Sequence, residues 1–468
     1  MRRFEFGFLG PRSVFIAMAV GLVLRASILY IYRNEPHRPN EPFVFSEAAF
    51  NFMRGKGFSW DIGFKDKIHE AHQAQRRFIE IDEVPRPKEE NLVPWRARAP
   101  GYPLYLALVF LLTGSLKAMY GHWLAVLLDG LAAWFIYKIG RHFFENRVAI
   151  VAAWVYALWV PNAIQAHLPN HDSLMSFLIL MSLLLFLRAM RVNSWWRYGA
   201  AGVATSVAMY FRQEPLLFPI LWTFGLVLLL GLRPGLLRGA FLAAIVFAST
   251  IPWSWRNYRV ENRWYFMMPE AWTAMYIGIW QYDYDHHFGL QEPMQTLSEA
   301  GMLDSWRSTV SERFFKNKCL SIIRNNPMWF LNNVILRQLA RYTIYPISNW
   351  TFFAREPWLK TYLAKGGTVL GYLVHYPVNF FSRFFGKLSE SLFFVLALLG
   401  IWLTRANWKK IYFLWSIPLF YIVGYLPLHA GPSYLLPGKS PLLILSAVTL
   451  VWCWDQIARR INGSTFAK

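Results

Sequence analysis

The sequence predicts an all-α polytopic membrane protein with about ten transmembrane helices and two large external loops. Of its 468 residues, 55% are hydrophobic and 18% are aromatic. Only 16% are charged, whereas a soluble chain of ordinary composition carries about a quarter. Apolar runs long enough to cross a bilayer, about 20 residues each, recur along most of the chain. Solvation by a membrane therefore explains the composition better than one oversized core does.

Ten apolar segments are predicted to span the membrane. Several are short, and their ends are uncertain by a few residues. They lie at residues 12–33, 119–140, 148–168, 172–190, 197–212, 214–232, 237–255, 386–404, 410–427 and 437–456.

The distribution of basic residues orients these spans. Short loops on the cytoplasmic side of a membrane are enriched in Lys and Arg. Alternate short loops and both tails carry such residues, namely Arg2, Arg3, Arg141, Arg147, Arg188, Arg191, Arg197, Arg233, Arg238, Arg405, Lys409, Lys410, Arg459 and Arg460. The opposite short loops, around residues 161–171 and 428–438, have only Lys439 at one margin. We therefore expect both termini to be cytoplasmic.

Two polar segments are too long to be simple connectors, and by helix parity both lie outside. We expect an N-terminal transmembrane module at 1–255 that includes the first external loop, 34–118. A second external loop follows at 256–385, and C-terminal transmembrane helices follow at 386–468.

Each external loop is predicted to carry an interfacial helix. Residues 44–54 read as a short amphipathic helix in the first loop. In the second, residues 327–343 combine apolar clusters with Arg337 and Arg341 at an i, i+4 spacing, a pattern typical of a helix that lies on the membrane surface.

The net charge of +21, from 48 Lys and Arg against 27 Asp and Glu, narrows the partners. Topology explains part of the excess, and anionic lipid headgroups or lipid-linked phosphates are the partners that it favours. No basic stretch forms a soluble domain, so nucleic acid is not an expected partner. Cys319 and Cys453 are too few for a disulfide framework, although a single bridge between them remains open.

Several short motifs share one family resemblance. They are Glu41-Pro42-Phe43-Val44-Phe45, Gly55-Lys56-Gly57-Phe58, Arg98-Ala99-Pro100-Gly101-Tyr102-Pro103, Arg212-Gln213-Glu214-Pro215 and Pro252-Trp253-Ser254-Trp255-Arg256-Asn257-Tyr258. With these strings the chain resembles the bacterial branch of the GT-C membrane glycosyltransferases, which includes protein O-mannosyltransferases and lipid A aminoarabinose transferases.

The resemblance implies a GT-C-like fold and a defined reaction. A sugar would pass from a polyprenyl-phosphate carrier to a cell-envelope acceptor: a lipid-linked glycan, a polysaccharide or a protein. The reaction would take place on the outer face of the bacterial cytoplasmic membrane. The partners would be membrane lipid, the lipid-linked sugar and the acceptor. The resemblance requires no cofactor, although a divalent metal ion is open.

Glu41 is the candidate general base that this resemblance indicates, with Phe45 as the aromatic residue four positions later. A sugar phosphate already has a good leaving group, so the step that needs help is removal of the acceptor's proton. General-base assistance typically contributes about 10²–10⁴-fold to the rate, and one-step displacement would invert the anomeric carbon. Glu47 is the nearby alternative. The structural alternative is that Glu41 is a solvated loop carboxylate.

His171 and Asp172 form the second candidate group, at the predicted outer turn before residue 173. Many relatives carry a carboxylate here, so Asp172 is a further catalytic candidate. Together the two side chains would contact the acceptor or a divalent ion, and His171 suits zinc better than magnesium. Alternatively, Asp172 only caps the following helix.

Arg98, Arg212 and Arg256 are the candidates for the donor phosphate, because all three lie at or near predicted outer ends of spans. Arginine offers a charged fork that matches phosphate geometry, although each of these side chains could instead extend to lipid headgroups. Relatives often carry an arginine in the last outer turn. Ser433 occupies that place here, and Lys439 is the candidate to supply the missing charge.

Arg25 lies inside the first span, roughly 20 Å along it at 1.5 Å per residue. We expect it near the outer leaflet, paired with a loop carboxylate. The spans otherwise appear in the sequence as nearly free of acids, and no halves repeat. Both features disfavour the alternative of a transporter or flippase, which uses ionisable residues deep in several spans. An oligosaccharide ligase or polymerase with a lipid-pyrophosphate donor remains open.

Overall fold

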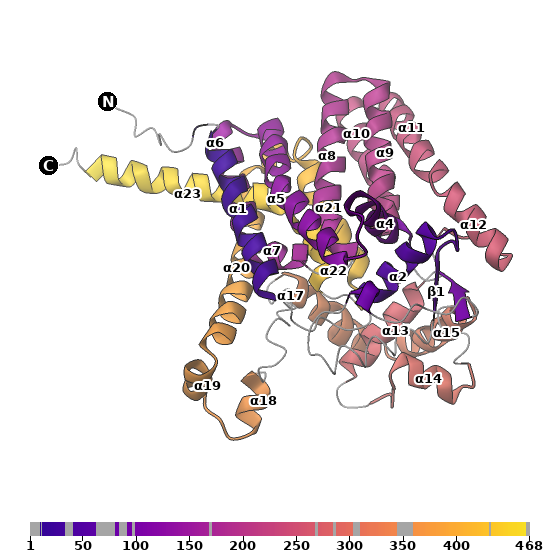
Figure 1. The fold of residues 1–468 in the computed structure, drawn as a ribbon. Coiled ribbons are helices and arrows are strands. Elements are labelled where there is room, and N and C mark those ends of the chain that lie inside the picture. Colours follow the sequence, from indigo (N-terminus) through magenta and orange to yellow (C-terminus); the bar gives the residue numbers. More distant parts are fainter. Residues whose placement is uncertain are drawn as a thin grey trace.

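The computed structural model describes residues 10, 12–32, 41–61, 80–83, 91–95, 99–167, 171–266, 270–283, 287–302, 309–343, 359–429 and 432–464. These residues form a helical bundle with a smaller helical layer at one end (Figure 1). The helices that correspond to the predicted spans are α1 (Arg12–Tyr32), α5 (Ala118–Phe143), α6 (Asn146–Leu158), α7 (Val160–His167), α8 (Met175–Val192), α9 (Trp195–Phe211), α10 (Phe218–Leu230), α11 (Leu232–Ala248), α20 (Pro377–Leu403), α21 (Tyr412–Tyr425) and α23 (Leu442–Ser464).

The predicted all-α membrane architecture is confirmed, although fewer helices than expected span by length alone. Within the described residues, five helices are long and apolar enough to cross a membrane, and a sixth span results if α6 and α7 are counted together. Three further predicted spans correspond to shorter apolar helices, Glu214–Leu230, Leu388–Leu403 and Tyr412–Tyr425.

The expectation of spans nearly free of acids needs correction. Asp129 lies in the middle of α5 and is 1% exposed, and Glu390 lies in α20 and is also buried. Arg25 is buried beside Asp129, 2.5 Å from Nε to Oδ2. Its partner is therefore a helix residue 104 positions away, and the expected pairing with a loop carboxylate was wrong.

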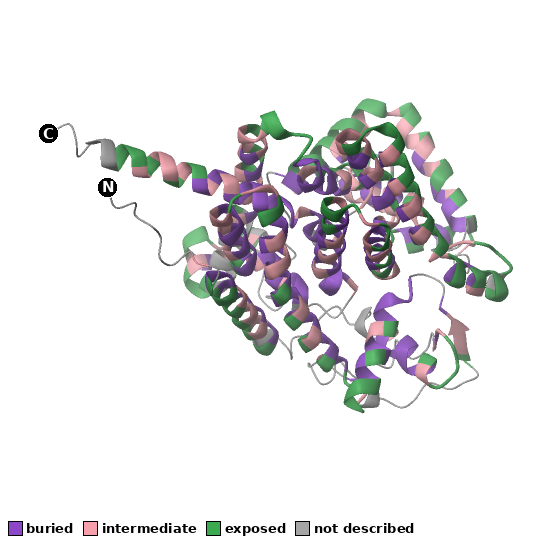
Figure 2. Cartoon of the chain, turned by 90° about the horizontal axis from the view of Figure 1, so that it is seen from above, coloured by how far each residue is buried: buried purple, intermediate pink, exposed green. Residues whose placement is uncertain are grey.

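Burial varies across the bundle as expected for a lipid-facing surface. In the span that begins at His171, 72% of the apolar window is buried, against 22% in the span Leu232–Val260. Figure 2 shows this difference as buried central helices and exposed outer ones. At the end of the outer span, Trp255, Tyr258 and Trp264 are exposed and contact one another, as is typical of a membrane–water interface.

The first external loop contributes more ordered structure than the sequence predicted. Its amphipathic helix is α2 (Glu41–Met53), and a two-stranded antiparallel sheet follows, in which β1 (Ser59–Asp61) pairs with β2 (Leu92–Pro94). The apolar helix α4 (Gly101–Thr113) was not expected. It packs closely on α9, because a Cβ on Gly101 would lie 2.3 Å from the Tyr210 carbonyl oxygen.

The second external loop forms the helical layer seen below the bundle in Figure 1. The predicted surface helix at 327–343 is present as three consecutive segments, α16, η7 and α17. The helix α12 (Ile251–Glu261) instead continues α11 and forms the end of the span Leu232–Val260. The helices of the loop are α13 (Ala271–Tyr282), α14 (Pro293–Glu299), α15 (Thr309–Asn325), α16 (Pro327–Phe330), η7 (Leu331–Leu336), α17 (Arg337–Thr343), α18 (Leu359–Ala364) and α19 (Val369–His375).

The predicted span 148–168 is bent rather than straight. Its two helices, α6 and α7, meet at 57°. Pro161 explains the bend, because proline has no N–H and its ring clashes with the carbonyl four residues earlier. The short helix η4 (His171–Leu174) then leads into α8.

Candidate functional site

A buried cluster of carboxylates around one arginine lies where η4 meets the C-terminal ends of α9 and α21. Arg212 follows α9 and is 7% exposed, and Asp172 in η4 is 2% exposed. Arg212 Nη1 donates to Asp172 Oδ1, and Arg212 Nε donates to Glu214 Oε1 at 2.9 Å. We call Asp172, Arg212, Glu214 and Tyr425 the outer cluster.

Aromatic residues complete the outer cluster. Arg212 Nη2 donates to the Tyr425 hydroxyl at 2.6 Å, and that hydroxyl donates to Glu214 Oε1. The Arg212 guanidinium also lies over the Tyr434 ring, 4.5 Å from its centroid. Tyr434 belongs to α22 (Pro432–Lys439). Two carboxylates therefore share one guanidinium in a site largely closed to solvent, where charge interactions are strong.

His171 connects the outer cluster to the first external loop. Its Nε2 lies 3.4 Å from Asp172 Oδ1. Its ring contacts Phe45 edge-on, with 5.6 Å between ring centroids. Position 41 begins α2 one turn before Phe45, so it lies on the helix face that meets His171. The side chain of Glu41 lies outside the described residues.

Glu47, on the same helix, is buried against β1. The backbone amide of Asp61 donates to Glu47 Oε1 at 2.6 Å. Burial raises the pKa of Glu47 to about 8, an effect that the bond from Asp61 only partly offsets. At neutral pH this carboxyl is therefore mostly protonated.

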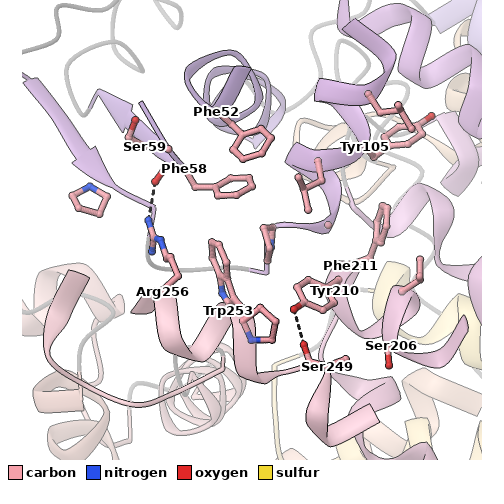
Figure 3. A pocket seen from close by; sticks show the side chains of 18 of the residues that line it. Phe52, Phe58, Ser59, Tyr105, Ser206, Tyr210, Phe211, Ser249, Trp253 and Arg256 are labelled. Carbon is pink, nitrogen blue, oxygen red and sulfur yellow. Dashed lines mark hydrogen bonds between the residues drawn. The ribbon is translucent and has the colours of Figure 1, made fainter. Parts of the chain in front are cut away.

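An apolar groove of about 1300 Å³ lies beside α2. Figure 3 shows Phe52, Phe58, Tyr105, Tyr210 and Trp253 around it, supplied by the first external loop, α4, α9 and α12.

The groove continues along the lipid-facing side of the bundle. Leu108 of α4 and Val203 and Val207 of α9 line it, and they are 54%, 56% and 41% exposed. The groove is thus open toward the hydrocarbon region.

Arg256 lies at the end of the groove near Phe58 and Ser59 (Figure 3). Its Nη1 donates to the Trp95 carbonyl at 2.7 Å and its Nη2 to the Phe58 carbonyl at 2.9 Å. The guanidinium also lies over the Trp253 ring, 4.8 Å from its centroid. Arg256 Nη1 also donates to the side-chain oxygen of Asn257 at 3.1 Å.

The sequence candidates thus fall into separate places. His171, Asp172 and Arg212 lie together, whereas Arg256 lies in the groove. Lys439 is directed to α20, with Nζ 3.9 Å from Glu390 Oε2. Arg98 lies outside the described residues.

A pair of aromatic residues connects the outer cluster and the groove. Phe45 contacts His171 on one side and Trp95 on the other, with 5.5 Å between the Phe45 and Trp95 ring centroids. Trp95 in turn accepts the hydrogen bond from Arg256.

Sequence reasoning missed two members of the outer cluster. Glu214 was visible in the Arg212-Gln213-Glu214-Pro215 motif, and its spacing of two residues from Arg212 was the available signal. Tyr425 comes from 213 residues beyond Arg212, and no local pattern indicates it.

The described residues show no group of three or more His, Cys, Asp or Glu side chains placed to hold a metal ion. Within that part of the chain, His171 and Asp172 contact each other, and Asp172 Oδ1 accepts a hydrogen bond from Arg212.

Comparisons with known proteins agree with this architecture. Residues 97–254 match the family model of dolichyl-phosphate-mannose-protein mannosyltransferases. No curated protein sequence matches the chain.

Among solved structures, the fold is similar to the oligosaccharyltransferase of Archaeoglobus fulgidus. The apo form has a TM-score of 0.51 at 11% identity, covering 99% of this chain and 52% of that one. The same enzyme with an inhibitory peptide and a dolichol-phosphate has a TM-score of 0.51 at 13% identity, covering 97% and 51%. This chain therefore spans about half the length of that enzyme.

The family match includes α4 through α11 with Asp172 and Arg212, and it ends before Arg256. The fold of the described residues is similar to that of the Archaeoglobus fulgidus oligosaccharyltransferase. The chain is thus a polytopic helical membrane protein with a GT-C-like fold, and its residues 97–254 match the sequence model of a mannosyltransferase family.

Proposed function

We propose that this protein transfers a sugar from a polyprenyl-phosphate donor to a cell-envelope acceptor on the outer face of the bacterial cytoplasmic membrane. The observation that carries the proposal is the apolar groove that ends at Arg256. A lipid-phosphate needs both features, an apolar path for the chain and a cation for the head. The acceptor would be a lipid-linked glycan, a polysaccharide or a protein.

The chemistry of the groove fits such a donor. The lipid-exposed Val203 and Val207 provide an entry from the membrane, so a prenyl chain reaches the site without leaving an apolar environment. Arg256 and Lys56 line the polar end. They would bind the phosphate, and the positive charge of Arg256 would stabilise the phosphate that leaves.

A carboxylate beside the groove would supply the base. The acceptor oxygen or nitrogen attacks the anomeric carbon, the bond from that carbon to the phosphate oxygen breaks, and the phosphate leaves with the electron pair. The acceptor's proton passes to the carboxylate, and the anomeric configuration inverts. Glu41 remains our first candidate for the base, and its place on the α2 face that meets His171 supports this choice.

Glu47 and Asp172 are the alternatives. Glu47 becomes the base only after it loses its proton, since its pKa is raised to about 8. Asp172 already accepts from Arg212. That contact favours a role for Asp172 in holding the acceptor, with His171 and Arg212 beside it.

The proposed orientation places the outer cluster and the groove on the extracytoplasmic side, with both termini in the cytoplasm. Arg141 and Arg147 at the α5–α6 turn mark the cytoplasmic side under the positive-inside rule. The exposed Trp255, Tyr258 and Trp264 support an outer interface at α12.

Two other functions make different predictions. An oligosaccharide ligase uses a lipid-pyrophosphate donor, and the fold is compatible with that chemistry. A transporter or flippase would need its buried ions to be available to a substrate, whereas Arg25 and Asp129 are bonded to each other.

Purified protein in liposomes, supplied with labelled polyprenyl-phosphate and polyprenyl-pyrophosphate sugars, tests the proposal. We expect transfer from the monophosphate donor and its loss in Glu41→Gln. Arg256→Ala should raise the donor KM about tenfold, because one charge-assisted contact contributes on the order of 1.5–3 kcal/mol. Arg259→Ala, an exposed arginine on the same helix, is the control and should leave the KM unchanged.

Transfer only from the pyrophosphate donor would establish the ligase. Movement of the labelled lipid across the bilayer without transfer would establish the flippase. An equal donor KM in Arg256→Ala and Arg259→Ala would show that Arg256 does not bind the donor phosphate.

A further inference from the structure

A set of buried polar side chains joins five helices inside the bundle. Its members come from α1, α5, α6, α7 and α8, and each is at most 2% exposed. They are Arg25, Asp129, Tyr156, Asn162 and Ser176. We call these five residues the inner network. Polar groups are costly inside a membrane protein unless they are bonded, so their clustering needs an explanation.

The bend between α6 and α7 supplies the first part of that explanation. Proline at position 161 cannot donate to the carbonyl of Ala157, four residues earlier, and its ring pushes that carbonyl aside. The freed carbonyl accepts from Arg25 Nη1 at 2.9 Å. Arg25 Nη2 donates to the neighbouring Tyr156 carbonyl at 3.3 Å. Arg25 thus replaces the donors that the α6–α7 helix loses at its break.

Asp129 neutralises this arginine and completes the inner network. Its two carboxylate oxygens accept from Arg25 Nε, the Tyr156 hydroxyl at 2.7 Å and Asn162 Nδ2 at 2.9 Å. Asn162, one residue after Pro161, in turn accepts from the Ser176 hydroxyl at 2.7 Å. The residues on both sides of the bend are therefore bonded to α1, α5 and α8.

The bend directs the chain to the outer cluster. The helix α7 ends at His167, and η4, which carries His171 and Asp172, begins four residues later. Ser176, two residues after η4, is itself a member of the inner network. The segment that carries Asp172 is thus anchored to the network at both of its ends, through Asn162 and through Ser176.

We propose that Arg25 and Asp129 are positioning residues that fix the α6–α7 bend and thereby hold His171 and Asp172 at the outer cluster. The catalytic significance of this role rests on the function proposed above. The structural part does not, because the bend is measurable without substrate.

The test distinguishes two roles of Arg25, which are the ion pair with Asp129 and the hydrogen bonds to the backbone carbonyls at the bend. In the charge-swapped variant Arg25→Asp/Asp129→Arg, an ion pair can still form, but the guanidinium starts from α5. The Ala157 carbonyl then loses its Arg25 donor, and the Tyr156 carbonyl keeps only the Trp159 backbone N–H. The variant Arg25→Met/Asp129→Leu removes both charges and serves if the swap does not fold, since apolar replacement of a whole buried pair is often tolerated.

The structural readout is hydrogen–deuterium exchange of backbone amides in the purified protein. We expect exchange in α7 and η4 to rise about tenfold in both double variants, because local opening reflects local stability. Exchange in α10 and the Tm should stay close to wild type. The control is Arg147→Met/Asp455→Leu, which removes an Arg–Asp pair between α6 and α23, 2.6 Å between Nη1 and Oδ1, and should leave α7 and η4 unchanged.

The functional readout is a split between kinetic constants. A mispositioned Asp172 should lower kcat at least about tenfold while the donor KM, set at the separate groove, stays constant. Unchanged exchange in α7 and η4 in both double variants would overturn the proposal, as would a uniform rise across all helices. If wild-type protein shows no transfer, the proposed function fails, and the exchange measurement still decides the positioning role.

Discussion

The inner network and the outer cluster both consist of arginine and carboxylate, yet they differ in how completely they are bonded. In the inner network Asp129 uses both oxygens, and Arg25 donates to Asp129 and to three backbone carbonyls, those of Gly21, Tyr156 and Ala157. One negative charge matches one positive charge. In the outer cluster two carboxylates share Arg212.

The difference lies most clearly in Glu214. Both contacts from Arg212 and the contact from Tyr425 go to Oε1. Glu214 Oε2 is buried and has no hydrogen-bond partner among the described residues. Buried polar atoms are nearly always bonded in a resting structure. The inner network is fully hydrogen-bonded and neutral, as expected for a structural role. The outer cluster contains two carboxylates for one arginine, and the unbonded Oε2 of Glu214 could accept a hydrogen bond from a bound hydroxyl or amine.

The largest expected effect comes from removing the shared cation. Arg212→Met leaves two buried carboxylates adjacent, which should cost about 3–5 kcal/mol of stability and abolish detectable transfer. Arg25→Met should cost a similar amount, because Asp129 is then buried without its countercharge. Thermal unfolding in detergent and the transfer assay measure the two effects.

Compensating variants then separate the two regions. Arg212→Met/Asp172→Leu/Glu214→Gln removes the cation and both negative charges, so it should regain much of the lost stability but no activity. Full activity in the stable triple variant would give the outer cluster a purely structural role, like that of the inner network.

A smaller effect is expected from neutralising Glu214. In Glu214→Gln the amide oxygen can still accept from Arg212 and Tyr425, so stability should change little. The open oxygen loses its charge, and kcat should fall about 10–100-fold, on the scale of a lost charge-assisted contact. Asp129→Asn should instead lose stability, because its amide would place N–H groups against the donors of Arg25 or Asn162.

The measurement compares Glu214→Gln with Asp129→Asn, and for each purified variant it records the thermal stability and the kcat. Equal losses of stability in Glu214→Gln and Asp129→Asn would remove the distinction between the clusters.

Much of the fold follows from local sequence. Apolar length gave the helical membrane class and most of the apolar helices, because the bilayer acts on each segment separately. The amphipathic helix predicted at 44–54 is present as α2, which begins three residues earlier. Pro161 can be seen in the sequence, but a proline inside an apolar segment can mark either a bend within one span or the start of a loop. The hydrogen bond from Arg25 to the freed carbonyl of Ala157, which only the structure shows, identifies a bend.

The contacts that define the site depend on distant residues instead. Arg25 meets Asp129 across 104 positions, and Arg212 meets Tyr425 across 213. Nothing in the sequence between such positions encodes the meeting, since packing of whole helices produces it. The helix α4 was missed for a related reason: its 13 residues are too short for a span, and only its packing on α9 reveals its place.

Glu47 is a third kind of buried carboxylate, bonded to a backbone amide by Oε1. Burial raises its pKa from 4.5 to about 8. Between these values the folded state keeps a proton that the unfolded state releases, so stability should fall as pH rises through this window.

The smallest expected effect therefore concerns pH rather than rate. Glu47→Gln imitates the protonated acid and still accepts from Asp61, so it should flatten the decline in Tm between pH 5 and pH 8. Transfer at pH 7 should persist, because this carboxyl is already mostly protonated there and Glu41 is the expected base. Complete loss of transfer with the same flattened Tm profile would instead make Glu47 the base. A buried and hydrogen-bonded carboxyl would then have a catalytic role rather than a structural one. In that case the degree of hydrogen bonding would not distinguish catalytic from structural carboxylates in this protein.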